Sequence, residues 1–240
     1  MPRTGKQAPA TVSRRVWLGE SAGLVALGCF GGLRPAAGMG RPPAVAKRRL
    51  LPEPGPMLPP VPAILLTVNG KPGDPDEISV VWTFVICGKP PQIGISVGHQ
   101  HLAEKLVDLH KEFVLNVPVA SVVQAFDKVD MNSSKVGDKF KLSGLTRGKA
   151  VKVNAPTVEE SPIHVECKVF HTLDVPPART MFLAEVVATS VHEGACDEKG
   201  RLIVSAVPFF GMSAGSGEFY TMGKLVGHIG QTVGRTDIKY

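Results

Sequence analysis

Residues 163–191 read IHVECKVFHTLDVPPARTMFLAEVVATSV and contain two long β-rich runs, Ile163–Val175 and 180–191. Val, Ile, Thr and Phe dominate both runs, and these residues favour extended backbone on a pleated surface. Pro176-Pro177 separates the runs, since proline interrupts regular structure. The segment therefore predicts two long strands, and the rest of the chain is interpreted outward from them.

Further strand signals precede these runs. Residues 63–69 form a β-rich run that ends at the turn dipeptide Asn69-Gly70, and residues 78–84 form a second run, which together predict a hairpin over 63–86. Residues 92–97 and 113–117 predict two more strands, whereas apolar spacing predicts short helices over 101–111 and 119–129. Many strands, few short helices and no regular alternation of strand and helix indicate a mainly β protein, a closed or half-closed barrel.

The net charge of +6 is distributed unevenly. Residues 1–50 hold nine of the 27 basic residues and one of the 21 acids, so the remaining chain is close to neutral. A folded domain without a surplus of basic residues lacks the positive surface that binding to a phosphate backbone requires. We therefore exclude nucleic-acid binding. The body's three widely spaced cysteines argue against a disulfide framework, and we predict that Cys87 and Cys167 are small buried side chains.

The N-terminal segment has the organisation of an export signal. Arg14-Arg15 precede a weakly apolar run over 22–30, which is followed by the small residues Pro35-Ala36-Ala37. The run is shorter than a membrane span of about 20 residues. We predict a twin-arginine-like signal peptide over 1–37, a Pro-rich linker over 38–61, one folded domain over 62–234 and a tail over 235–240. Export would be to the periplasm in a bacterium. A lipid anchor at Cys29 and an organellar transit peptide stay open as alternatives.

Gly211-Met-Ser213-Ala-Gly215 matches the G-x-S-x-G pattern of a serine-hydrolase nucleophile elbow. An elbow needs a helix after the serine, and the following Gly215-Ser-Gly217 is a poor helix start. His228 also precedes Asp237, which reverses the usual order of acid and histidine. A Gly-rich loop is the better interpretation, and a hydrolase using Ser213 stays an alternative.

His99-Gln-His101 stands where a strand ends and a helix begins. No carboxylate or cysteine lies nearby at ligand spacing, so we predict no metal site. Unpaired N–H groups and the helix dipole favour an anion at such a position, and Gly98 permits close approach of the backbone. A solvated turn with two surface histidines is the alternative. The chain has no G-x-G-x-x-G after a strand and no P-loop.

The order of several motifs resembles the flavin reductase-like family, and most closely its flavoredoxin-type branch. The most specific motif is Glu160-Ser-Pro-Ile-His-Val-Glu-Cys-Lys168, which resembles the family's E-S-P-x-x-L-E-C-R. The other matching stretches are Ser79-Val-Val-Trp82, Cys87-Gly-Lys-Pro-Pro91, Ile95-Ser-Val97, Glu112-Phe-Val-Leu-Asn-Val-Pro118, Lys135-Val-Gly-Asp-Lys-Phe140, Ser143-Gly-Leu-Thr146, Glu185-Val-Val187 and Glu218-Phe-Tyr-Thr-Met-Gly223.

This resemblance implies a Greek-key split β-barrel of the FMN-binding type, which dimerises and holds FMN non-covalently near the subunit interface. It implies that Ser79, Val80, Val81 and Trp82 lie along the isoalloxazine ring. It implies a ribityl and phosphate end formed by Ser96, Val97, Gly98, His99, His101 and Ala103, with Lys135 supplying charge to the phosphate or a substrate. His101 and Ala103 replace the family's Arg and Thr, so another flavin is an alternative to FMN.

The leading functional hypothesis is therefore a flavin-dependent redox protein, in which the cofactor does the chemistry and the protein positions it. A reductase fed by NAD(P)H and an electron-transfer flavoprotein are its two subtypes, and export would favour the second. The alternative from another class is a split barrel that has lost or exchanged its flavin and binds a different ligand.

Overall fold

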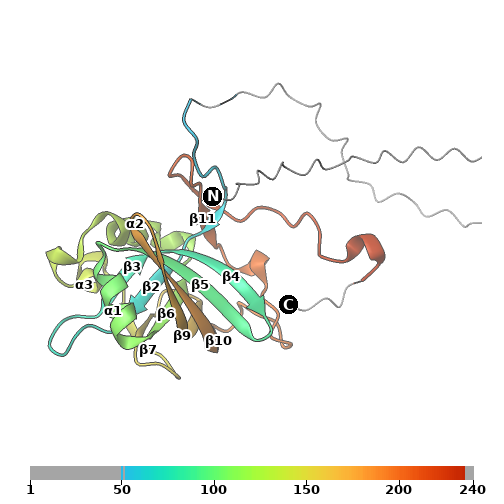
Figure 1. Cartoon of the computed structure of the whole chain (residues 1–240). Coiled ribbons are helices and arrows are strands. Elements are labelled where there is room, and N and C mark those ends of the chain that lie inside the picture. Colours follow the sequence, from blue (N-terminus) through green and yellow to red (C-terminus); the bar gives the residue numbers. More distant parts are fainter. Residues whose placement is uncertain (1–49, 51, 236–240) are drawn as a thin grey trace, which may run out of the picture. The chain divides into compact units, whose positions relative to one another are not determined.

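The computed structural model describes Leu50 and residues 52–235 (Figure 1). The predicted signal peptide over 1–37 and most of the tail lie outside the described residues, as does the linker up to residue 49. Residues 52–60 are exposed and form no strand. No helix in the described part is long and apolar enough to span a bilayer.

The chain forms twelve strands in the described residues, interrupted by short helices. The strands are β1 (Val61–Pro62), β2 (Leu65–Val68), β3 (Glu77–Val80), β4 (Trp82–Gly88), β5 (Pro91–Gly98), β6 (Glu112–Val117), β7 (Arg147–Lys149), β8 (Pro156–Val158), β9 (Ile163–Val175), β10 (Arg179–Val191), β11 (Phe210–Met212) and β12 (Phe219–Thr221). The helices are α1 (Leu102–His110), α2 (Val123–Met131) and α3 (Lys139–Ser143), with 3₁₀ turns at Ala120–Val122, Ser134–Val136, Val204–Ala206 and Gln231–Val233.

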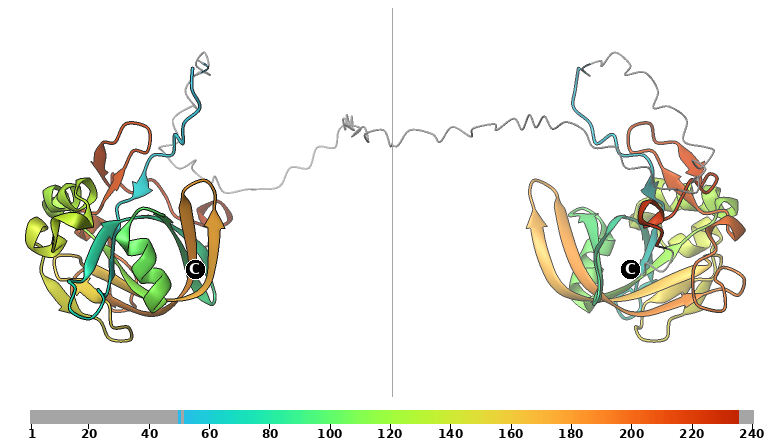
Figure 2. Two further views of the ribbon diagram at one scale, coloured as in Figure 1. Left: turned by 60° about the vertical axis from the view of Figure 1, so that its left-hand side comes forward. Right: turned by 90° about the vertical axis from the view of Figure 1, so that its right-hand side faces the viewer.

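Seven strands form one curled antiparallel sheet in the order β3-β2-β6-β9-β10-β5-β4. Its two edge strands, β3 and β4, are consecutive in sequence and are separated only by Val81. The Val81 N–H donates to the Ile64 carbonyl at 3.4 Å, so the sheet bends back on itself at this residue. The result is a split β-barrel, mainly β with short helices, which confirms the predicted fold class (Figures 1 and 2).

Strand β2 and the two residues before it explain why residues 63–68 are apolar except for Thr67. Ile64, Leu66 and Val68 point into the barrel, where they pack with Leu106 of α1. The alternate residues of the same strand face a second cluster, which α2 and α3 cover with Phe126 and Phe140. A strand buried on both faces needs no polar alternation, and each such side chain contributes about 1.5–3 kcal/mol on burial.

The predicted helices and long strands are confirmed with shifts of a few residues. The run predicted over 78–84 is wrong as a single strand, because the bend at Val81 divides it into β3 and β4. The short elements α3, β7, β8, β11 and β12 were not predicted, since runs of three to five residues carry too little periodicity.

Candidate functional site

A cleft of about 580 Å³ opens between the start of α1, strand β3 and the segment that follows α2. Its walls are formed by residues 100–102 and Lys105 on one side and by residues 129–135 on the other, with Ser79, Val80 and Lys139 between them. This volume is typical of sites for small molecules and cofactors. The two walls differ in chemistry, and each is described in turn.

The first wall is the N-terminus of α1. His101 is the N-cap residue in extended conformation, and its side chain makes no capping hydrogen bond. The first N–H groups of a helix have no intrahelical acceptor, so this end of α1 favours an anion. A Cβ at Gly98 would lie 2.8 Å from Cδ2 of His101, so glycine is needed for the imidazole to pack back against β5.

Charged side chains line the mouth of the cleft. Lys105 and Lys135 are exposed there, and neither ammonium has an ion-pair partner among the described residues. Asp130 opposes them, but burial and then the charge of Asp127 raise the pKa of its carboxyl, against the influence of His101.

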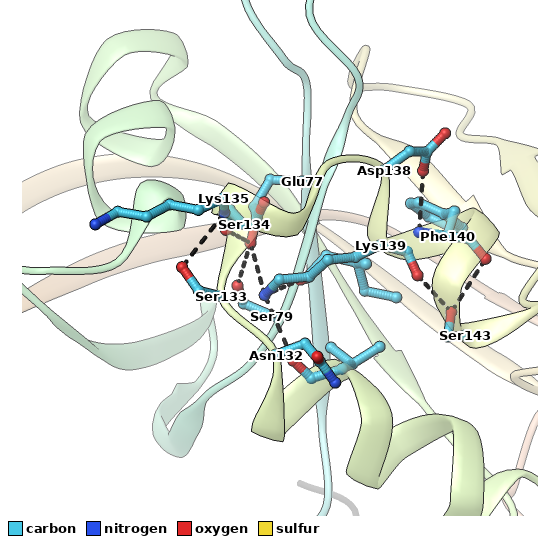
Figure 3. A network of polar contacts seen from close by, with 12 residues as sticks. Glu77, Ser79, Asn132, Ser133, Ser134, Lys135, Asp138, Lys139, Phe140 and Ser143 are labelled. Carbon is cyan, nitrogen blue, oxygen red and sulfur yellow. Dashed lines mark hydrogen bonds and ion pairs between the residues drawn. The ribbon is translucent and has the colours of Figure 1, made fainter.

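A polar network centred on Glu77 forms the floor (Figure 3). Oε1 of Glu77 accepts hydrogen bonds from the hydroxyls of Ser79 at 2.7 Å and Ser134 at 2.8 Å, and lies 3.1 Å from the ammonium of Lys139. Only 4% of the Glu77 side chain and 5% of the Lys139 side chain are exposed. A buried carboxylate is tolerated because it is paired and hydrogen-bonded.

Lys139 also ties the network to the backbone. Its ammonium donates to the carbonyls of Ile78 at 3.2 Å and Val129 at 3.4 Å, so its three N–H groups all have acceptors. The Ile78 carbonyl belongs to the edge strand β3, and Val129 belongs to α2. Lys139 therefore joins the strand and the helix that lie on either side of the floor.

Asp138 fixes the start of α3, the helix that carries Lys139. Its Oδ1 accepts from the N–H groups of Phe140 at 3.0 Å and Lys141 at 3.3 Å, and from the guanidinium of Arg147 at 2.7 Å. Partial burial alone would raise the pKa of the Asp138 carboxyl, but these hydrogen bonds from Arg147 and the backbone lower it below its usual value. The cap holds the C-terminal end of the cleft segment in place.

The structure brings four of the predicted site residues together at this cleft, namely Ser79, Val80, His101 and Lys135. Val81, Val97 and Ala103 are buried in the barrel core instead. The hydroxyl expected from a Thr at position 103 would therefore point into the core, because Ala103 has no exposed surface. The side chains of these three residues therefore do not contribute to the cleft.

The remaining predicted residues lie outside the cleft walls. Trp82 borders a smaller apolar cavity of about 40 Å³ on the other side of Val80. Ser96 and Gly98 lie on β5, where the Arg179 guanidinium donates to the Ser96 hydroxyl at 2.8 Å and to its carbonyl at 2.6 Å. His99 pairs with Asp174 through Nε2 at 3.0 Å. Arg179 was not predicted from the sequence.

Sequence reasoning also missed several residues of the cleft. Lys105, Ser133, Ser134 and Lys139 line it, and Glu77 organises its floor. Two signals were available. Glu77 and Ser79 alternate on one face of a strand that is otherwise apolar, and Lys139 follows the capping aspartate in the segment from Lys135 to Phe140.

Ser213 does not lie on a nucleophile elbow. It follows β11, and the N–H groups of Ser216 and Gly217 donate to its carbonyl in a turn that leads to β12. The expected helix is therefore absent from this described segment, as the interpretation of a Gly-rich loop predicts. No group of three or more His, Cys, Asp or Glu within the described residues is placed to hold a metal ion.

Comparison with known proteins gives the following similarities. A family model described as "Flavin reductase like domain" matches residues 59–205. An uncharacterised protein of Pyrococcus abyssi is 27% identical over 130 residues, which are 54% of this chain and 74% of that protein.

Two solved structures have similar folds. Flavoredoxin of Desulfovibrio vulgaris (Miyazaki F) superposes with a TM-score of 0.70 at 23% identity, over 76% of this chain and 97% of that chain. An FMN-binding protein from Thermus thermophilus superposes with a TM-score of 0.60 at 18% identity, over 73% of this chain and 94% of that chain.

Proposed function

We propose, from the premise that this chain belongs to the flavin reductase-like family, that it binds FMN in the cleft beside α1 and acts as a flavin-dependent redox protein. The observation that carries the proposal is the combination of features in this one cleft. A cavity of about 580 Å³ joins hydroxyls at its floor to two ammonium groups and a helix N-terminus at its mouth. A planar heterocycle with a phosphate tail needs both sets of groups.

The residues present fit such a group. Lys105 and Lys135 would hold the phosphate together with the N–H groups at the start of α1. Val80 and the backbone of β3 would lie along the ring, and Ser79 would reach its polar edge. When bound, the flavin supplies the electron transfer, since it accepts and releases electrons in one or two steps. The protein's own residues bind it, orient it and exclude water from the floor.

Binding of FMN to the purified protein tests this proposal. We expect a yellow protein with a flavin absorption spectrum, or saturable quenching of flavin fluorescence when FMN is added to colourless protein. Lys105→Ala combined with Lys135→Ala should weaken FMN more than riboflavin, which lacks the phosphate. A colourless protein that does not bind added FMN would contradict the proposal and favour a split barrel that has exchanged its flavin for another ligand.

We further propose that the protein is a homodimer, as the family resemblance implies. Trp82, Ser96, Met181 and Leu173 are direct partners across β4, β5, β10 and β9, so they share one face of the sheet. The opposite face holds Ile95, Val97 and Phe182 of the barrel core.

On this outer face, Trp82 is 42% exposed and Leu173 is 47% exposed, and the neighbouring Phe84 is 41% exposed. Strand β4 is also an edge of the sheet. Exposed aromatic and aliphatic side chains on one sheet face beside an edge strand are typical of a surface that another subunit covers.

We also propose export through a twin-arginine-like signal, supported by Arg14-Arg15 and the weakly apolar run that follows them. Soluble NAD(P)H is not expected outside the cytoplasm, so electron carriage is favoured over a reductase fed by NAD(P)H. N-terminal sequencing of the mature protein tests the signal, with cleavage near Ala37 expected. NADH oxidation assays separate the two redox subtypes.

A further inference from the structure

The floor of the cleft contains two serine hydroxyls whose protons are already donated in hydrogen bonds within the protein. Ser79 and Ser134 both hydrogen-bond to Oε1 of Glu77, at 2.7 and 2.8 Å. A carboxylate has no proton to give, so in each bond the hydroxyl is the donor. The ammonium of Lys139 lies 3.1 Å from the same oxygen and forms a buried ion pair with it. Each hydroxyl therefore keeps only its lone pairs for a ligand.

Lys139 cannot act as a donor to the ligand either. Its three N–H groups are taken by Glu77 and by the carbonyls of Ile78 and Val129, at 3.1, 3.2 and 3.4 Å. An ammonium group has three donors and no acceptor. The lysine that lies deepest in the cleft is thus part of the floor, although its charge suggests an anion site.

Ser133 has the opposite polarity, although it is the neighbour of Ser134. Its hydroxyl oxygen accepts from the N–H of Lys135 at 3.3 Å, and this leaves its proton available to a ligand. Ser133 and Lys135 are both exposed on the cleft wall. Figure 3 shows Ser79, Ser134 and Lys139 converging on Glu77, whereas the ammonium of Lys135 points away from it.

We infer that Glu77, held by Lys139, fixes Ser79 and Ser134 as hydrogen-bond acceptors, so that the floor selects a ligand edge with an N–H donor and the phosphate lies at the mouth beside Ser133 and Lys135. This inference rests on the proposed function, and it adds the orientation of the ligand and the residues that determine it. In neutral solution a phosphate monoester is mostly a dianion, whose oxygens only accept hydrogen bonds, so at the floor they would meet the lone pairs of the serine hydroxyls. The ring edge of oxidised flavin carries one N–H, and this group fits an acceptor floor.

Two ratios of dissociation constants test the inference, each measured by fluorescence titration. The ratio of riboflavin to FMN reports the contribution of the phosphate. In 3-methyl-FMN a methyl group replaces the ring N–H proton. The ratio of the dissociation constant of 3-methyl-FMN to that of FMN therefore reports the contribution of that donor. Ser79→Ala and Ser134→Ala change the floor, and Ser133→Ala is the matched control on the adjacent residue of the same wall.

We expect Ser79→Ala to lower the 3-methyl-FMN ratio by about threefold to tenfold, which is the effect of one lost hydrogen bond. Neither Ser79→Ala nor Ser134→Ala should alter the riboflavin ratio, and Ser133→Ala should lower that ratio while leaving the 3-methyl-FMN ratio unchanged. A riboflavin ratio that falls in Ser134→Ala as much as in Ser133→Ala would overturn the inference. So would a 3-methyl-FMN ratio that Ser79→Ala leaves at the wild-type value.

The failure of the inference and the failure of the proposed function give different results. If wild-type protein shows no saturable binding of FMN or riboflavin, the proposed function is wrong and the ligand assignment fails with it. If FMN binds but the ratios do not follow the pattern above, FMN binding stands and the acceptor polarity of the floor is wrong.

Discussion

Replacing Lys139 by methionine should strongly destabilise the domain. Methionine retains most of the aliphatic stem but removes the ammonium, which leaves the buried carboxylate of Glu77 with two hydroxyl donors and no counter-charge. Removing one partner of a buried ion pair costs about 3–5 kcal/mol. The carbonyls of Ile78 and Val129 also lose a donor, which contributes to the same loss.

Urea denaturation of the cofactor-free protein at pH 7, followed by circular dichroism, measures this loss. For a domain of this size, about 3–5 kcal/mol corresponds to a fall in melting temperature of about 6–20 °C. Lys141→Met is the matched control, because Lys141 is exposed on the same helix and its side chain has no ion pair in the described structure. It should change stability by no more than about 0.5 kcal/mol.

If Lys139→Met alone does not fold, the double variant Glu77→Gln with Lys139→Met still tests the ion pair. It removes both charges and retains an acceptor for the serine hydroxyls, so it should be more stable than Lys139→Met by at least about 2 kcal/mol. A loss below about 1 kcal/mol in Lys139→Met, or a double variant as unstable as the sum of its single changes, would refute the assignment of a buried ion pair.

Three other predictions concern the rest of the domain. Leu173→Glu should convert the proposed dimer to monomers in sedimentation velocity, whereas Leu142→Glu, at an exposed position of α3, should not. Asp138→Ala should cost about 1–2 kcal/mol at pH 7 through the lost helix cap. Because the folded-state pKa of Asp138 is lowered, its stabilisation is present above the unfolded-state pKa and is lost as pH falls through the folded value, so this difference should shrink in acid. Burial, and then the charge of Glu166, raise the pKa of Cys167 to about 12, so a thiol reagent at pH 8 should modify this cysteine only after denaturation.

The fold could be predicted from the sequence because its longest strands carry strong local signals. The strands β9 and β10 are thirteen residues each, and α1 shows a clear apolar face. The division of β3 from β4 could not be predicted. Val81 is as β-prone as its neighbours, and the bend at this residue comes from closure of the barrel, where its N–H meets the carbonyl of Ile64. Closure is a property of the whole sheet and leaves no local pattern.

The candidate site was predictable at the level of segments and not of side chains. Ser79, Val80, His101 and Lys135, which come from three separate segments, line one cleft. The family resemblance places Ala103 at the phosphate end, yet its side chain is on the inner face of α1 and fully buried. A resemblance between sequences aligns positions along the chain, whereas the direction of each side chain depends on how the helix packs against the barrel.

Whether a serine hydroxyl in this site can donate or only accept a hydrogen bond from a ligand is the property that is hardest to predict from the sequence. Ser133 and Ser134 are the same residue type and adjacent in the chain, but they are bonded to different groups. Ser134 donates to a carboxylate from β3, 57 residues earlier, and Ser133 accepts from the backbone two residues later. The long-range contact makes one hydroxyl an acceptor and the local contact makes the other a donor. Selection of a ligand by this difference therefore depends on the tertiary fold. A substitution of Glu77 should change ligand selectivity although both serines are retained.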